Sequence, residues 1–149
     1  MRAELRTLFI IWVAMLGALG VYVAIGEVLT PSVASPPEPY LRYACYAAAL
    51  AQLVAIPFIR RTMLAGKLGA TDRGGQGDAP GAGAYLTAVI VSLALAESIG
   101  LYGLVLVALG FPVQVLHEFV FISAVALVIH RPKAAELERT IRARGQRSI

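Results

Sequence analysis

The chain has 149 residues, of which 58% are hydrophobic and only 15% are charged, and its mean hydropathy is +0.74. A typical soluble domain has roughly 45–50% apolar and about 25% charged residues, so this composition excludes an ordinary soluble globular protein. The net charge is +4, but the basic residues flank apolar segments instead of alternating with aromatic residues, which argues against nucleic acid as a partner.

Four apolar stretches are long enough to cross a hydrocarbon core of about 30 Å. They are residues 8–29, 40–59, 84–109 and 112–129. In lipid the backbone must be hydrogen-bonded within each stretch, and none of the four alternates as a barrel strand does. The sequence therefore predicts an all-α polytopic membrane protein, with four transmembrane helices in a bundle of two hairpins.

The first stretch also raises the alternative of a cleaved signal peptide, because Arg2 and Arg6 precede it. Its apolar run of about 20 residues is longer than the 7–15 residues of a signal-peptide core. We therefore expect a membrane span, whereas cleavage would leave three spans. A proline-rich segment at 30–39 predicts a stiff connection to the second span.

Residues 60–83 form the predicted central loop, and its stretch 71–83 is a glycine-rich flexible linker without the spacing of a phosphate loop. Gly110-Phe111-Pro112 predicts a tight turn that joins the third and fourth spans as an antiparallel hairpin. We accordingly divide the chain into a four-helix transmembrane domain, residues 1–133, and a basic tail, residues 134–149, whose mixed charges predict a solvated helix that touches anionic lipid.

The basic residues predict the orientation. Of the 13 Lys and Arg residues, all except Arg42 lie on one side: before the first span, between the second and third, or after the fourth. By the positive-inside rule, both termini and the central loop are expected in the cytoplasm. We expect a multi-pass protein of a bacterial inner or plasma membrane.

Glu97 lies near the middle of the third span, which places its carboxyl near the bilayer midplane. A charged side chain there costs about 2.5–3.5 kcal/mol on insertion scales, so the neutral acid is favoured over the carboxylate. An acid in this position can take up and release a cation. The alternative is that Glu97 only forms a hydrogen bond with Gln52 or a tyrosine.

Small residues recur beside Glu97 at spacings of three and four. They are Ser92, Ala96, Gly100 and Gly103. This spacing places them on one helix face, where they would let another helix approach closely. We assign them to helix packing.

The run Leu93–Val105, with the sequence LALAESIGLYGLV, resembles the second helix of the ring-forming proteolipid, subunit c, of rotary ATP synthases and V-type ATPases. The resemblance implies that Glu97 is an ion carrier, with Ser98 and Tyr102 beside it. Members that carry Na⁺ pair a glutamine on the first hairpin helix with Glu-Ser on the second, and Gln52 with Glu97-Ser98 supplies these residue types. A proton needs only the carboxyl and is the default.

The chain departs from that family in its second span, which contains alanines but no glycine, and in its long central loop. The resemblance implies partners in the bilayer: other membrane subunits, a homo-oligomeric ring and a channel subunit that supplies an arginine. The sequence has no serine, histidine and acid set, and Cys45 is its single cysteine. We therefore expect no enzyme activity of the chain by itself, no cofactor and no metal centre.

Two other functions remain open: an accessory structural membrane subunit, and a small antiporter that uses Glu97 to exchange a cationic solute. Polar residues near the other membrane face also allow two interpretations. They are Glu27, Arg42, Gln114, His117 and Glu118. They could form one cluster that gives access to Glu97, or each could reach the interface alone.

Overall fold

The computed structural model describes residues 2–29, 38–64 and 82–145, and within them the chain forms five helices and no strand. The helices are α1 (Arg2–Val28), α2 (Pro39–Leu64), α3 (Ala82–Ala108), α4 (Val113–Ile129) and α5 (Ala134–Gly145). The predicted all-α fold is confirmed. Most of the proline-rich segment 30–39, and residues 65–81 of the predicted central loop, lie outside the described residues.

Three of these helices contain segments long and apolar enough to cross a membrane: Leu5–Val28, Pro39–Leu64 and Tyr85–Ala108. The 17-residue α4 is followed by α5 after a bend of 51°, and the two together count as one broken span. At 1.5 Å per residue α4 is about 26 Å long, which approaches the thickness of the hydrocarbon core. The chain is therefore a multi-pass membrane protein, and the predicted four spans are reached when α4 and α5 count as one span.

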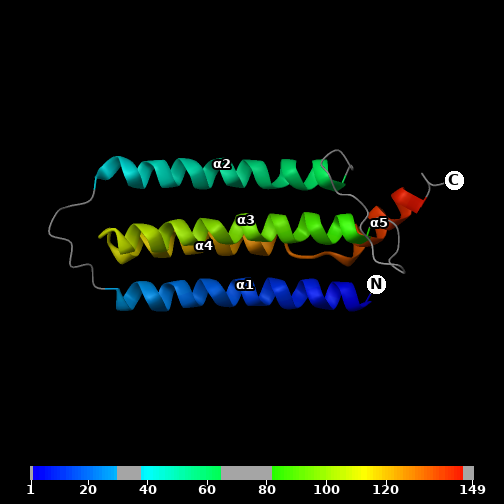
Figure 1. Cartoon of the computed structure of the whole chain (residues 1–149), viewed down its shortest axis with the longest axis horizontal. Helices are drawn as coiled ribbons and strands as arrows, with labels where there is room; N and C mark the ends of the chain where they lie inside the picture. The colour runs from blue at the N-terminus through cyan, green and yellow to red at the C-terminus, as the bar shows by residue number, and fades with distance from the viewer. Residues whose placement is uncertain (1, 30–37, 65–81, 146–149) are drawn as a thin grey trace.

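The α3–α4 hairpin occupies the middle of the bundle, with α1 and α2 on opposite sides of it (Figure 1). Each of α1, α2 and α4 packs against α3. The predicted tight turn is present: Gly110 has a φ of 97°, and Pro112 in extended conformation precedes α4. We call this end of the bundle the Gly110 end, and the opposite end, where α5 lies, the α5 end.

The buried apolar side chains form two clusters. The first joins all five helices and contains Leu8, Leu19, Ile56, Tyr85, Val89, Leu93, Ala96, Ala126, Leu127 and Leu137. The second joins α2, α3 and α4 toward the Gly110 end and contains Ala49, Ile99, Leu106, Phe111, Val115 and Phe119. Because lipid tails are as apolar as leucine, close packing rather than the exclusion of water stabilises these helix contacts.

The α5 end contains the predicted tail helix, but this helix packs on the bundle instead of being wholly solvated. The helix α2 continues to Leu64, so the first residues of the predicted loop are helical, and α5 occupies most of the predicted tail. Arg60, which the sequence places in the loop, is only 8% exposed. Its Nη2 lies 2.5 Å from Glu136 Oε2 of α5, and Leu137 is buried against the bundle. These contacts hold α5 against the bundle.

Candidate functional site

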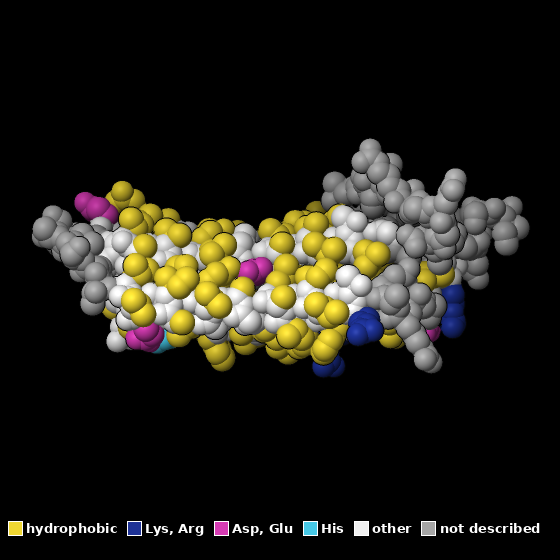
Figure 2. Space-filling view, turned by 60° about the horizontal axis from the view of Figure 1, so that its bottom comes forward, with side chains coloured by type: hydrophobic (Ala, Val, Ile, Leu, Met, Phe, Trp, Pro, Cys, Tyr) yellow, Lys and Arg dark blue, Asp and Glu magenta, His cyan; other side chains and the backbone are white. Residues whose placement is uncertain are grey.

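Glu97 lies on the outward face of α3, at its edge beside α1. Positions 90, 94, 97, 101 and 105 follow one another at spacings of three and four, so they share one face of the helix. Ile90, Ala94, Leu101 and Val105 are exposed, and Glu97 in the middle of this row is partly buried. Figure 2 shows one acidic side chain in the middle of the apolar surface, while the other charged side chains in view lie toward the ends.

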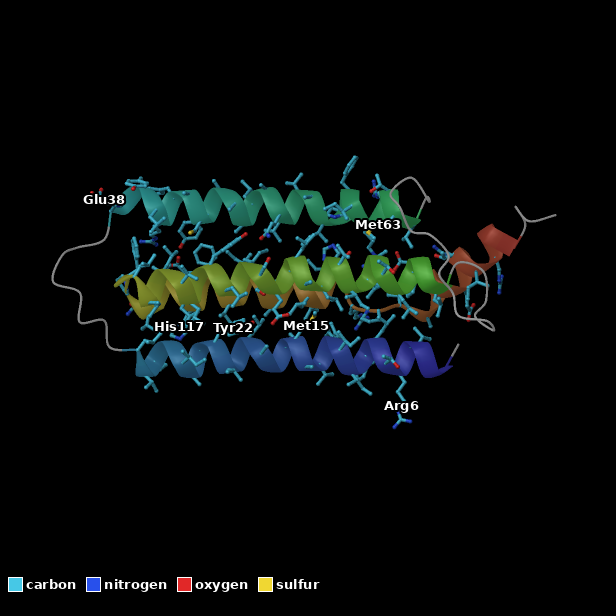
Figure 3. All side chains as sticks on the ribbon, viewed as in Figure 1. Arg6, Met15, Tyr22, Glu38, Met63 and His117 are labelled. Atoms are coloured by element: carbon cyan, nitrogen blue, oxygen red, sulfur yellow. The ribbon has the colours of Figure 1, made fainter. Side chains whose placement is uncertain are left out.

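A hydrogen bond from α1 holds the Glu97 side chain. The Tyr22 hydroxyl donates to Glu97 Oε1 at 2.7 Å, and Figure 3 shows Tyr22 between α1 and the α3–α4 hairpin. In the described part of the chain, no donor reaches Oε2. One oxygen of the carboxyl is therefore fixed by α1, and the other is available for a proton.

Gly100 lies where α1 packs against α3, next to Leu19 and Tyr22. A Cβ at this position would lie 2.7 Å from Leu19 Cδ2 and 3.5 Å from Tyr22 Cδ2. The first distance is shorter than any ordinary carbon contact, so a larger residue would require the end of the Leu19 side chain to move, while the Tyr22 distance is an ordinary contact. Gly100 thus belongs to the contact between α1 and α3 in which the Tyr22 hydroxyl reaches Glu97, one helix turn away.

The predicted partners Gln52 and Ser98 form a separate pair between α2 and α3. Gln52 Nε2 donates to Ser98 Oγ at 3.0 Å, and Ser98 Oγ donates to the Leu95 carbonyl at 2.8 Å. Gln52 Oε1 is buried without a hydrogen-bond partner. Successive helix residues point about 100° apart, so Ser98 faces α2 while Glu97 faces α1.

Tyr102, the remaining candidate, packs toward the second apolar cluster. Its ring meets the Phe119 ring edge to face, with the centroids 6.5 Å apart. The four predicted site residues therefore do not surround one point. The contact to Glu97 comes instead from Tyr22. The sequence allowed a tyrosine as a partner but did not single out Tyr22, whose only signal is a phenolic hydroxyl within an apolar span that needs a partner.

The row of small residues on α3 lies in the contact between α3 and α4. Ser92, Ala96, Gly100 and Gly103 are all buried. The Ser123 hydroxyl of α4 donates to the Ala96 carbonyl at 2.7 Å, and a Cβ at Gly103 would lie 2.8 Å from Phe119 Cβ. Ala96 and Gly103 thus meet α4, and Gly100 lies between α1 and Ser123 of α4. The row assigned to helix packing is the packed side of α3, next to the outward face that carries Glu97.

The polar residues at the Gly110 end form two separate groups. Glu118 of α4 pairs with Arg42 at 3.4 Å and accepts a hydrogen bond from Tyr46, both of α2. His117 Nε2 lies 3.2 Å from Glu27 Oε1 of α1. The first group joins α4 to α2 and the second joins α4 to α1, so each fastens an outer helix to the hairpin.

The site therefore consists of one mid-membrane acid, one phenolic donor and an apolar surround, without further ionisable groups at that depth among the described side chains. In residues 2–29, 38–64 and 82–145, no group of three or more His, Cys, Asp or Glu side chains is placed to hold a metal ion. The chain matches no known family model, no curated protein and no solved structure.

Proposed function

We propose that this protein is an ion-translocating membrane subunit, similar to proteolipid c, in which Glu97 binds and releases a proton. One observation carries the proposal: Glu97 lies in the middle of the outward apolar row of α3, and one hydrogen bond, from Tyr22, holds it. In that position the acid can remain neutral toward lipid and can be reached by a partner. The chain supplies the carrier and no catalytic apparatus.

The physical basis is the unequal cost of the two protonation states. A carboxylate facing hydrocarbon costs about 2.5–3.5 kcal/mol on insertion scales, and a neutral acid costs less. Proton release at Glu97 therefore requires a partner that offers water or a cation. That requirement would couple proton transfer to movement of this helix face past a second subunit, such as one that presents an arginine.

A proton fits the contacts better than Na⁺. A sodium ion needs several oxygen ligands around one point, and Gln52 and Ser98 are turned toward each other between α2 and α3. Glu97 instead accepts from Tyr22 of α1. A proton needs only the free oxygen of the carboxyl, so we assign the proton as the transported ion.

We further propose that the α5 end faces the cytoplasm. The basic side chains Arg60, Arg61, Arg131 and Lys133 belong to this end, whereas Arg42 lies in the first turns of α2 near the Gly110 end. This distribution is the one that the positive-inside rule assigns to a cytoplasmic face. A bacterial inner or plasma membrane is the corresponding location.

Carbodiimide labelling tests the proposal, because dicyclohexylcarbodiimide reacts with protonated acids in apolar sites. In protein reconstituted into liposomes, we expect modification at Glu97 that decreases as the pH rises and disappears in Glu97→Gln. Glu118→Gln is the matched control, since it removes an exposed acid at the Gly110 end and should leave the labelling unchanged. Labelling of Glu97 no faster than that of Glu118 would contradict the proposal.

The Tyr22 hydrogen bond also favours a second function, an accessory subunit in which Glu97 only fastens α1 to α3. Infrared spectroscopy separates the two. A carrier shows a carboxylic acid carbonyl band that titrates with pH and is missing in Glu97→Gln. An accessory role predicts a band that stays constant across the pH range in which the protein remains folded.

A further inference from the structure

A cavity of about 360 Å³ lies between α2 and α4, in the half of the bundle toward the α5 end. Its walls are Leu53 of α2 and Phe121, Ile122, Val125 and Ile129 of α4, and His130 lies at its end. Its volume falls within the range of about 300–1,000 Å³ typical of ligand sites. Because Phe121 and Ile129 are 70% and 60% exposed, the cavity opens toward the lipid phase.

Two arginines lie next to the His130 end of this groove, one bonded to the His130 carbonyl and one following His130 in the chain. Arg60 follows Leu53 by seven residues, or about two turns of α2, and its Nη1 donates to the His130 carbonyl at 3.3 Å. Glu136 pairs with Arg60 and balances its charge. The adjacent Arg131 side chain is exposed and forms no ion pair in the described part of the chain. The mouth therefore keeps an unmatched positive charge.

We propose that this groove binds one anionic phospholipid from the leaflet at the α5 end. One acyl chain lies along Leu53, Ile122 and Val125, and the phosphate is held by Arg131 with His130 beside it. The apolar walls exclude a polar ligand, and basic pockets between transmembrane helices bind anionic headgroups. A zwitterionic lipid would fill the same walls but would leave the charge of Arg131 less well matched.

The test measures how much lipid the purified full-length protein retains, using native mass spectrometry with phosphatidylglycerol and phosphatidylcholine as probes. We expect one phosphatidylglycerol to bind in preference to phosphatidylcholine. Arg131→Gln should weaken it about fivefold, since one arginine near the surface contributes a factor of this size. Arg139→Gln is the matched control, with the same charge change on α5 outside the groove, and should have no comparable effect.

A variant that fills the groove tests the acyl-chain part independently of charge. Val125→Trp should abolish the bound phosphatidylglycerol, with circular dichroism verifying that the helices remain. Equal retention of both lipids, or equal losses in Arg131→Gln and Arg139→Gln, would overturn the proposal. So would disulfide-linked dimers of Val125→Cys in a Cys45→Ser background, because the groove would then be an interface between two copies of the chain.

Discussion

Two faces of α3 at the same depth in the membrane differ in burial and in the presence of an acid. The packed face, toward α4 and α1, has small residues, Ser92, Ala96, Gly100 and Gly103, and every one of them is buried. The outward face has Ile90, Ala94, Leu101 and Val105 around Glu97, and these apolar residues are exposed. One helix thus presents a fixed packing surface on one side and, on another, an acid that is held by one hydrogen bond.

The difference indicates how a titratable group can be placed in a bilayer without weakening the bundle. Packing in lipid depends on close contact between helices, and α3 makes that contact through residues that carry no charge. Glu97 lies outside the α3–α4 contact, so a change in its protonation does not require the hairpin to repack. The variants below test this division, beginning with the largest expected effect.

Alanine substitution of two leucines, one on each face of α3, tests the difference between the faces directly. Leu106 is fully buried in the second apolar cluster, and Leu101 is 40% exposed on the outward face. Leu106→Ala should lower the free energy of unfolding by about 2 kcal/mol or more, because the lost packing leaves a cavity. Leu101→Ala should change it by less than about 0.5 kcal/mol, since lipid replaces the lost contacts. Denaturant titration in detergent micelles measures both, and equal losses would refute the division.

Gly103→Ala tests the packed face by adding a single methyl group. The new Cβ would lie 2.8 Å from Phe119 Cβ and 3.0 Å from Leu116 Cα. Neither atom is the end of a flexible side chain, so we expect a loss of about 1–3 kcal/mol from overpacking. Gly83→Ala on the same helix has nothing within 4 Å and should leave the thermal midpoint unchanged or slightly higher. A tolerated Gly103→Ala would contradict the close contact between α3 and α4 at this position.

Ser123→Ala removes the hydrogen bond to the Ala96 carbonyl across the same face. Hydrogen bonds between transmembrane helices average about 0.6 kcal/mol, so a loss of this size is expected. Ser92→Ala is the matched control, because its hydroxyl donates to the Ala88 carbonyl of its own helix. A larger loss in Ser92→Ala than in Ser123→Ala would reverse the assignment of these two hydroxyls.

The sequence was sufficient to predict the long apolar helices and the turn between the third and the fourth. Apolar runs bounded by basic residues set the span limits, and glycine followed by proline located the turn at Gly110. The depth of Glu97 followed from its place in the run. These features depend on residues close together in the chain and on the thickness of the bilayer, so they need no knowledge of which helices are neighbours.

The neighbours of Glu97 could not be predicted in the same way. The sequence offered Gln52 as a partner of Glu97, but the rotation of α2 and α3 turns Gln52 toward Ser98. Tyr22 reaches Glu97 because α1 packs against α3 beside Gly100, a contact between segments far apart in the chain. Arg60 likewise became a buried partner of Glu136 only when α5 packed back onto the bundle.

Glu97→Gln should have the smallest effect on stability. The amide oxygen of glutamine can still accept from the Tyr22 hydroxyl, so we expect the free energy of unfolding to stay within about 0.5 kcal/mol of the original value. Tyr22→Phe should lower it by about 0.6 kcal/mol, the average for one hydrogen bond between transmembrane helices. Chemical denaturation of both variants and of the double variant measures how strongly the two side chains are coupled.

The outcome of that cycle bears on function as well as on packing. Proton transfer at Oε2 can leave the Tyr22 bond to Oε1 in place, but a carrier whose side chain turns toward a partner must release that bond, so a weak coupling between Tyr22 and Glu97 suits transport. If Glu97→Gln instead cost more than about 2 kcal/mol, a loss of the kind that follows from breaking a buried polar network, the side chain would be part of the scaffold. The accessory role would then replace transport, because an acid on which the fold depends cannot release its contacts in every cycle.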